Sequence, residues 1–240
     1  MNPWLTAQGL DCISETLQRC SNNPGLYFYC LHTFGHLLVS ITAQNIKLFK
    51  NPELKASLMN CFQQLAKNSA WEDKLTSLTG IDEVEYSVFT QVFSGFLVLC
   101  ELDDIAKIKS YESLVLLLTN NFEARKFAKS EEVVARLFPD TVNQNPRIRH
   151  LALETLALLL TDSQNAEFFL NKKLVSNLVS QVLTKFPESQ NGVLKVLEAA
   201  KHPQVWKQVL KEEKLKLKAL TKGNLTAPLK AHIQEITKCF

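Results

Sequence analysis

The chain has 240 residues, of which 46% are hydrophobic and 21% are charged, and its formal net charge is +3. This balance is typical of a folded globular protein and excludes a disordered polyelectrolyte. Seven Gly and eight Pro are few for this length, so long helices are favoured over the many turns that an all-β chain needs.

The N-terminus, the lengths of the apolar runs and the cysteines indicate a compartment. Residues 1–10 lack the basic start and continuous apolar centre of a secretory signal, and no apolar run reaches the roughly 18 residues of a membrane span. The six cysteines are scattered over expected apolar helix faces, which favours reduced, buried thiols over disulfides. They are Cys12, Cys20, Cys30, Cys61, Cys100 and Cys239. We therefore expect a cytoplasmic protein without a transmembrane segment, with nuclear or cytoskeleton-associated placement as the alternative.

Taken in chain order, Pro and Gly breaks divide the sequence into about five helical units with no long linker. The breaks fall at Asn51-Pro52, Thr79-Gly80, Phe138-Pro139 through Asn145-Pro146, Phe186-Pro187 and His202-Pro203. The expected units are residues 5–50, 51–80, 81–138, 145–186 and 190–222, followed by a C-terminal helix over 226–240. Because nothing separates these units, we expect a single domain over residues 1–240.

The unit at residues 145–186 shows the helical pattern most clearly. Three- and four-residue spacing predicts a first helix whose buried side holds Ile148, Leu151, Ala152, Thr155, Leu156, Leu158 and Leu159. Thr161-Asp162-Ser163 supplies side chains that accept backbone N–H bonds and start a second helix. That helix continues to Lys185, where Pro187 disfavours helical geometry at Phe186.

An internal repeat appears when the chain is aligned with itself. Glu112–Thr119 matches Glu154–Thr161 without a gap at an offset of 42 residues. Gln44–Leu54 matches Gln164–Leu174 at an offset of 120, which is three times 40. A period near 40 is typical of arrays in which each helical unit buries its apolar face against its neighbours.

In these segments the chain resembles the armadillo-like (armadillo and HEAT) helical repeat superfamily, over roughly residues 25–220. The resemblance implies an all-α fold: an α-solenoid of about five stacked repeats forming a right-handed superhelix with a concave surface for protein partners. In typical armadillo repeats an Asn ladder clamps the backbone of an extended peptide. The corresponding positions here are Leu38, Gln64, Leu116 and Leu158, so only Gln64 retains an amide.

No catalytic motif stands out. There is no GxSxG elbow and no Gly-rich phosphate loop, and we expect neither enzyme activity nor a cofactor. Cys30, His32 and His36 have a spacing that permits metal binding, but the apolar residues around them indicate a packed helix, so no metal site is expected. The carboxylates at residues 82–85 and 101–104 are interpreted as helix starts, with an acidic rim for a basic partner as a second role.

Charge and exposed aromatics supply the remaining site residues. Residues 195–240 hold 10 basic and 4 acidic side chains, a net charge of +6, whereas residues 1–194 hold 17 and 20, a net charge of −3. At least one of Tyr27 and Tyr29 is expected to be exposed, because both cannot share the helix side of Phe28. The expected partner-binding residues are Tyr27, Tyr29, Gln64, Lys211, Lys214, Lys216 and Lys218.

The sequence thus predicts a non-enzymatic protein-interaction scaffold or adaptor within a larger assembly. It would bind a helix or peptide of an unidentified protein partner on a concave face. Two alternatives stay open: a chaperone cofactor of armadillo type, and a basic-surface binder of nucleic acid or anionic membrane through the Lys-rich C-terminal helix. Nucleic acid is disfavoured because the Lys-rich residues 206–222 include no Arg and only Trp206 as an aromatic residue.

Overall fold

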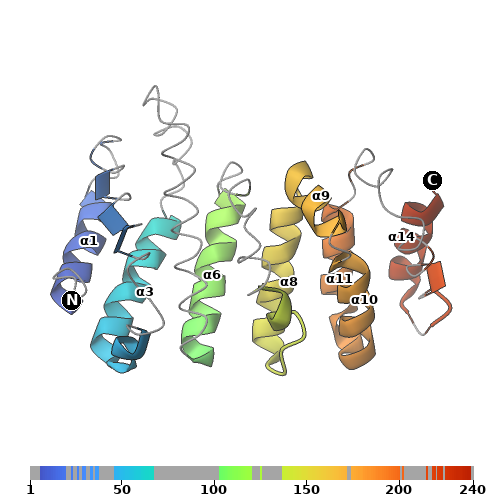
Figure 1. Cartoon of the computed structure of the whole chain (residues 1–240), viewed down its shortest axis with the longest axis horizontal. Coiled ribbons are helices and arrows are strands. Elements are labelled where there is room, and N and C mark those ends of the chain that lie inside the picture. Colours follow the sequence, from blue (N-terminus) through green and yellow to red (C-terminus); the bar gives the residue numbers. More distant parts are fainter. Residues whose placement is uncertain are drawn as a thin grey trace. The chain divides into compact units, whose positions relative to one another are not determined.

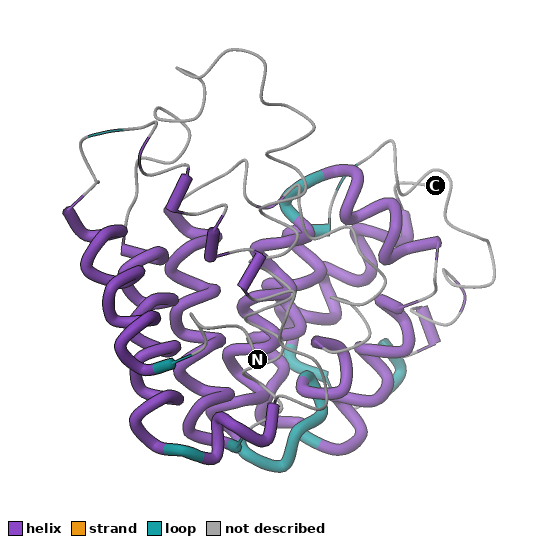
Figure 2. The backbone as a smooth tube through the Cα atoms, turned by 60° about the vertical axis from the view of Figure 1, so that its left-hand side comes forward, coloured by secondary structure: helices purple, strands orange, loops and turns teal. Residues whose placement is uncertain are grey.

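The described part of the chain is built from helices. The structure is a computed structural model that describes residues 6–19, 23, 26, 29–30, 33–34, 36–37, 46–67, 103–120, 125, 137–171, 174–200, 202, 215, 218–219, 221–223 and 225–238. These residues form helices and connecting turns without a strand, which confirms the all-α prediction (Figure 2). None of their helices combines the length and hydropathy that a membrane crossing requires.

The chain divides into two compact units, Met1–Val133 and Val134–Phe240. In the first unit, α1 (Ala7–Arg19), α3 (Pro52–Lys67) and α6 (Asp104–Asn120) lie side by side, with α3 in contact with both others (Figure 1). The short 3-10 helix η2 (Ile46–Lys50) leads into α3. A single repeat domain over residues 1–240 stays a prediction.

The core of the first unit forms between the apolar sides of its helices. Leu10 and Leu17 of α1 and Leu58 and Phe62 of α3 are fully buried. Phe62 meets Phe34 edge to face, with ring centroids 5.2 Å apart, an arrangement favoured by the ring quadrupoles. Asn51 caps α3 as its side chain accepts from the backbone N–H groups of Glu53 and Leu54, which confirms the predicted break at Asn51-Pro52.

Two buried thiols donate to the backbone of α1. Cys61 Sγ lies 3.0 Å from the Leu10 carbonyl, and Cys30 Sγ lies 3.8 Å from the Ile13 carbonyl. Burial, reinforced by the nearby negative charge of Asp11, strongly raises the pKa of the Cys61 thiol. The prediction of buried, free thiols is therefore right for Cys30 and Cys61.

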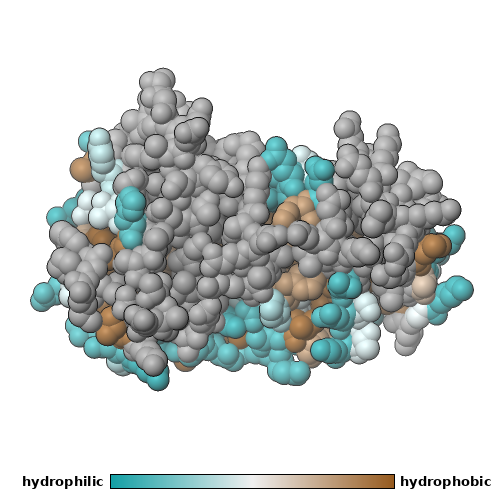
Figure 3. Space-filling model, in the orientation of Figure 1, coloured by the Kyte–Doolittle hydropathy of each residue, from teal (hydrophilic) through white to brown (hydrophobic). Residues whose placement is uncertain are grey.

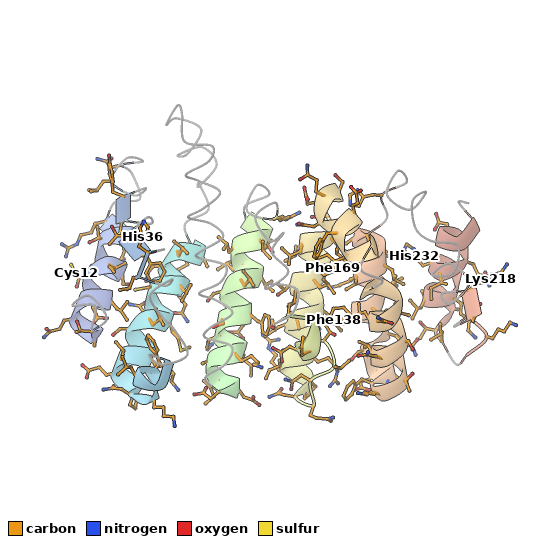
Figure 4. All side chains as sticks on the ribbon, in the orientation of Figure 1. Cys12, His36, Phe138, Phe169, Lys218 and His232 are labelled. Atoms are coloured by element: carbon orange, nitrogen blue, oxygen red, sulfur yellow. The ribbon has the colours of Figure 1, made fainter. Side chains whose placement is uncertain are left out.

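That prediction is wrong for Cys12, which is free but exposed. The buried side of α1 is formed by Leu10, Ile13, Ser14 and Leu17. Two residues after Leu10, the helix has turned by about 200°, so Cys12 lies on the opposite side (Figure 4). Cys20, Cys100 and Cys239 lie outside the described residues.

The second unit contains α8 (Pro146–Leu160), α9 (Ser163–Asn171), α10 (Leu174–Lys185), the 3-10 helix η4 (Pro187–Ser189), α11 (Gln190–Ala199) and α14 (Ala227–Lys238). Helix α11 packs against α8, α10 and α14, and α9 contacts α8 and α10. The approach of α11 to α8 is close at Gly192, where an added Cβ would lie 2.8 Å from Leu153 Cδ1. Helix α14 lies within the segment 226–240 for which a C-terminal helix was predicted.

Capping residues set the helix boundaries of this unit. Asn145 accepts from the backbone N–H of Arg147, with Pro146 at the first helical position of α8. Asp162 accepts from the backbone N–H groups of Gln164 and Asn165 and so starts α9. Helix α10 ends at Lys185, directly before Phe186-Pro187. These boundaries confirm the sequence predictions for residues 145–186.

The predicted break from Phe138-Pro139 through Asn145-Pro146 is present but begins later than expected. Residues 137–140 are helical, and the chain turns only at Thr141 and Val142, whose N–H groups donate to the carbonyls of Phe138 and Pro139. Proline fixes φ near the helical value and removes only its own N–H donor, so one helical turn can contain it. The boundary therefore falls a few residues later than expected.

Helix α8 is buried on nearly every side. Its buried residues are Ile148, Arg149, Leu151, Ala152, Leu153, Thr155, Leu156, Ala157, Leu159 and Leu160. Leu158, which was predicted on the buried side, is only half-buried, because it follows Arg147, His150 and Glu154 at three- and four-residue spacing along the remaining polar stripe. The six other predicted positions are buried.

Burial recurs with the offset of the sequence repeat. The buried residues of α6 are Ala106, Ser110, Tyr111, Ser113, Leu114, Leu117 and Leu118, and each has a buried counterpart 42 residues later in α8. Six buried residues of α3 likewise have buried counterparts 52 residues later in α6: Leu54, Leu58, Cys61, Phe62, Leu65 and Ala66. Helices α3, α6 and α8 therefore present equivalent buried sides.

The match at an offset of 120 is weaker in three dimensions. Phe49 and Phe169 are both buried, as are Leu58 and Leu178. Beyond them, the same offset pairs the buried Cys61 with the exposed Gln181. The alignment joins α3 to α10, and these two helices bury different sides.

Arg149 is buried within the second unit and all of its nitrogens are engaged. Its Nε donates to Ser189 Oγ at 2.9 Å and its Nη1 donates to the Asn143 carbonyl at 2.7 Å. Its Nη2 pairs with Glu188, and the guanidinium carbon lies 3.8 Å from the centroid of the Phe186 ring. One planar cation thereby links α8 to the turn before it and to η4, which lies between α10 and α11.

We expect Leu156→Ala to lower the free energy of unfolding by roughly 2–5 kcal/mol, because it opens a cavity around a side chain that is fully buried. The matched change Leu158→Ala should cost less, since that side chain is only half-buried. Urea denaturation of both variants measures the difference. Equal losses would contradict the assignment of Leu156 to the buried side of α8 and of Leu158 to its polar stripe.

We expect Arg149→Met to lower the free energy of unfolding by roughly 1–3 kcal/mol, because it removes three hydrogen bonds from a buried side chain to partly buried oxygen atoms. Glu188→Gln should cost less than about 1 kcal/mol. The Glu188 side chain is 61% exposed, so water can take the place of its carboxylate beside Arg149. Thermal or urea unfolding of the two variants compares them. A larger loss for Glu188→Gln than for Arg149→Met would contradict the assignment of the stabilisation to the hydrogen bonds of Arg149.

Candidate functional site

A surface groove lies between α3 and α6 in the first unit. It has a volume of about 290 Å³ and is lined by Pro52, Lys55, Ala56, Met59, Asn60, Gln63, Ile105 and Lys109. The lining combines apolar side chains with two lysines and two amides, and it contains no carboxylate. The volume suits one or two inserted side chains, because pockets for drug-sized ligands begin at roughly 300 Å³.

Ile105 is a large apolar residue of the groove, with 70% of its surface accessible. It belongs to an outward stripe of α6 that continues through Lys109 and Glu112 to Leu116, which is 40% exposed. On the face drawn in Figure 3, the described residues include many hydrophilic ones with apolar ones among them. An isoleucine in the first turn of a helix, open to solvent beside a groove, is a plausible contact residue.

Asp103 joins α3 and α6 at one end of the groove. Its Oδ1 accepts from the backbone N–H of Ala106 at 2.8 Å and so caps α6, as the sequence predicted for this carboxylate cluster. Its Oδ2 lies 2.6 Å from Lys55 Nζ on α3. The hydrogen bond from Lys55, followed by that from Ala106, lowers the pKa of Asp103. Because this contact joins the starts of α3 and α6, the two helices run in the same direction.

The amides of α3 are engaged with α1. Asn60 Nδ2 donates to Ser14 Oγ at 3.0 Å, and Gln64 Nε2 lies 3.5 Å from Asn60 Oδ1. The second contact is at the long limit for a hydrogen bond. Gln64, the one predicted ladder position with an amide, therefore points into a chain of polar contacts that ties α3 to α1.

The predicted partner-binding residues do not form one site. Tyr29 is 71% exposed, which confirms that at least one tyrosine of its pair faces solvent. Gln64 is half-buried in the same unit, and Lys218 is exposed in the second unit (Figure 4). Tyr27, Lys211, Lys214 and Lys216 lie outside the described residues.

The residues considered for metal binding are split by burial. Cys30 is buried and His36 is exposed, while His32 lies outside the described residues. Over the described ranges, no three side chains of His, Cys, Asp or Glu gather as metal ligands would. The chemistry that the groove offers is apolar contact, amide hydrogen bonding and attraction of anions.

Sequence reasoning missed Ile105 and Met59. A signal for Ile105 was present, because the offset of 42 aligns it with Arg147, a polar position that the structure also leaves exposed. An apolar residue at a position that is polar in the next copy indicates a surface role. For Met59 there was no such signal, since a methionine beside Leu58 on a helix is usually part of the core.

Comparison with protein families, curated proteins and solved structures finds no match to this chain. The resemblance to armadillo-like repeats therefore rests on the sequence pattern alone. The function proposed below therefore rests on the groove and the exposed residues described above.

The ion pair at the groove should make a small, pH-dependent contribution to stability. Since the folded state lowers the pKa of Asp103, the contribution is present above the unfolded pKa near 4 and is lost as pH falls through the lower folded value. Both side chains are partly exposed, so Asp103→Asn, which keeps a capping oxygen, should cost less than about 1 kcal/mol at pH 7.

The measurement is the free energy of unfolding of wild type and Asp103→Asn between pH 7 and pH 2. The difference between the two proteins should shrink toward pH 2. Asp103→Ala serves as the control, because it also removes the cap and should remain destabilised at low pH. A difference for Asp103→Asn that grows on acidification would be incompatible with a lowered pKa.

Proposed function

We propose that this chain is a non-enzymatic protein-interaction scaffold, built as an α-solenoid of armadillo-like or HEAT-like repeats, that holds a segment of a partner protein. The repeated burial of α3, α6 and α8 supports the solenoid, because equivalent helices with equivalent buried sides are what stacked units require. In such arrays the sides left open on successive units are the usual binding surface.

The observation that carries the proposal is the surface left open on these equivalent helices. Gln64, Leu116 and Leu158 share one position in the three helices, and all three reach the surface. Two of the three are leucines on helices whose other leucines are mostly buried. Apolar side chains kept at solvent-facing positions of a repeat are explained by contact with another protein.

The test is site-specific photocrosslinking of the full chain in cell lysate. A photoreactive residue is placed at Leu116 or Leu158, with the exposed Thr184 of α10 as the matched control. We expect both leucine positions to crosslink the same protein and the control to crosslink none of it. Equal labelling from all three positions, or no defined product from either leucine, would remove the support for a scaffold surface.

A charge-reversal variant decides between this proposal and the basic-surface alternative. Lys211, Lys214, Lys216 and Lys218 are changed together to Glu, and crosslinking from Leu116 is repeated. We expect the product to persist. Loss of the product, or recovery of only nucleic acid or lipid by the wild-type chain, would favour binding through the C-terminal lysines.

A further inference from the structure

The groove between α3 and α6 has a polarity that restricts what it can bind. Pro52, Ala56, Met59 and Ile105 form its apolar lining, and Lys55 and Lys109 are its only charged lining residues. Lys55 is held by Asp103 and Lys109 by Glu112, at 2.6 and 3.0 Å. Because an ammonium has three donors and each lysine contacts one carboxylate among the described residues, each can accept a second anionic partner.

Both helices also begin at this end of the groove. The contact of Lys55 with Asp103 places the first turn of α3 beside the start of α6. Asn51 and Asp103 already cap these two N-termini, so the positive charge that faces the groove comes from the lysines. The favoured occupant therefore carries carboxylates near that end and an apolar side chain between Met59 and Ile105.

The amides of α3 argue against an extended peptide. Such a peptide must satisfy its own backbone groups by bonding to side chains of the surface that it crosses. Of the two amides that line the groove, Asn60 already donates to Ser14 and accepts from Gln64 and so serves the packing of α3 on α1, and Gln63 alone cannot match the successive backbone groups of an extended peptide. A helical segment satisfies its backbone internally and needs only an apolar side for the groove.

The dimensions agree with a helix. On α3 the groove runs from Pro52 to Gln63, about three helical turns or roughly 16 Å. Pro52, Ala56, Met59 and Gln63 recur at three- and four-residue spacing along this length, so they form one ridge. A third helix laid between this ridge and the stripe of Ile105 and Lys109 would contact both.

We propose, building on the scaffold function, that this groove docks an amphipathic helix of a partner protein whose apolar side chains enter beside Ile105 and whose acidic residues meet Lys55 and Lys109. The docking depends on the apolar contact for affinity and on the lysines for selecting an acidic helix. The partner is thus an acidic amphipathic helix, and its place is the groove between α3 and α6.

The test is differential selection from a displayed library of helical peptides. Apolar residues are fixed at positions i, i+4 and i+7, and flanking positions are drawn equally from Glu, Gln and Lys. The library is selected in parallel against the full chain and its Ile105→Glu variant, with Leu215→Glu as a matched control at another exposed aliphatic residue. Circular dichroism checks that each variant is folded.

We expect wild type and Leu215→Glu to enrich peptides with Glu at the flanks, and Ile105→Glu to bind those peptides at least tenfold more weakly. Lys109→Gln should reduce the preference for Glu over Gln. The proposal is overturned if no peptide is enriched over the Ile105→Glu selection, if Lys-flanked peptides win, or if a central proline leaves binding intact. Concentration-dependent dimerisation abolished by Ile105→Glu would show that a second copy of the chain occupies the groove.

These outcomes are separable from the scaffold test. Crosslinking of a partner from Leu116 and Leu158 without any peptide selected through Ile105 would leave the scaffold standing and remove only the groove. Failure of both experiments would remove the scaffold as well.

Discussion

The apolar character of α8 constrains how its neighbouring helices pack. A helix with one polar stripe cannot lie on the surface of a unit, because most of its circumference must be removed from water. Helices α9 and α11 contact α8, and Gly192 allows α11 to approach Leu153 closely. The same buried pattern in α6, 42 residues earlier, places the same demand on its neighbours. Neighbouring helices are thus a condition for the stability of each unit.

Close packing of this kind requires that the polar groups at the helix ends find partners. Asn145 and Asp162 cap the starts of α8 and α9. At the end of α8, Asn165 Nδ2 donates to the Leu159 carbonyl, and His202 Nε2 lies 3.0 Å from the Leu160 carbonyl. In the first unit, Arg125 Nε donates to Leu118, the residue equivalent to Leu160. The two equivalent helix ends are therefore satisfied by different side chains, which hides the equivalence in the sequence.

These details explain what the sequence could and could not predict. Local rules were sufficient for the all-helical class and for the boundaries at Asn51, Asn145, Asp162 and Pro187, because each depends on residues adjacent in the chain. The sides of helices were less accessible: Leu158 was assigned to the core since apolar spacing cannot distinguish a wide buried side from a narrow exposed stripe. The offset of 120 likewise aligned two helices with different buried sides, because sequence similarity follows composition more closely than it follows environment.

The candidate site was harder still, because it depends on contacts between segments distant in the sequence. Gln64 matched the position of a peptide-clamping amide, yet in three dimensions its amide faces Asn60, whose own amide reaches Ser14 about 46 residues earlier in the chain. Asn60, which lines the groove, is therefore already engaged in the packing of α3 on α1. The proposed docking relies on the apolar lining of the groove more than on its amides. There the ion pairs of Lys55 and Lys109 hold two cations next to Ile105 without closing the groove. In the proposed docking, this arrangement selects the partner by charge and binds it by apolar contact.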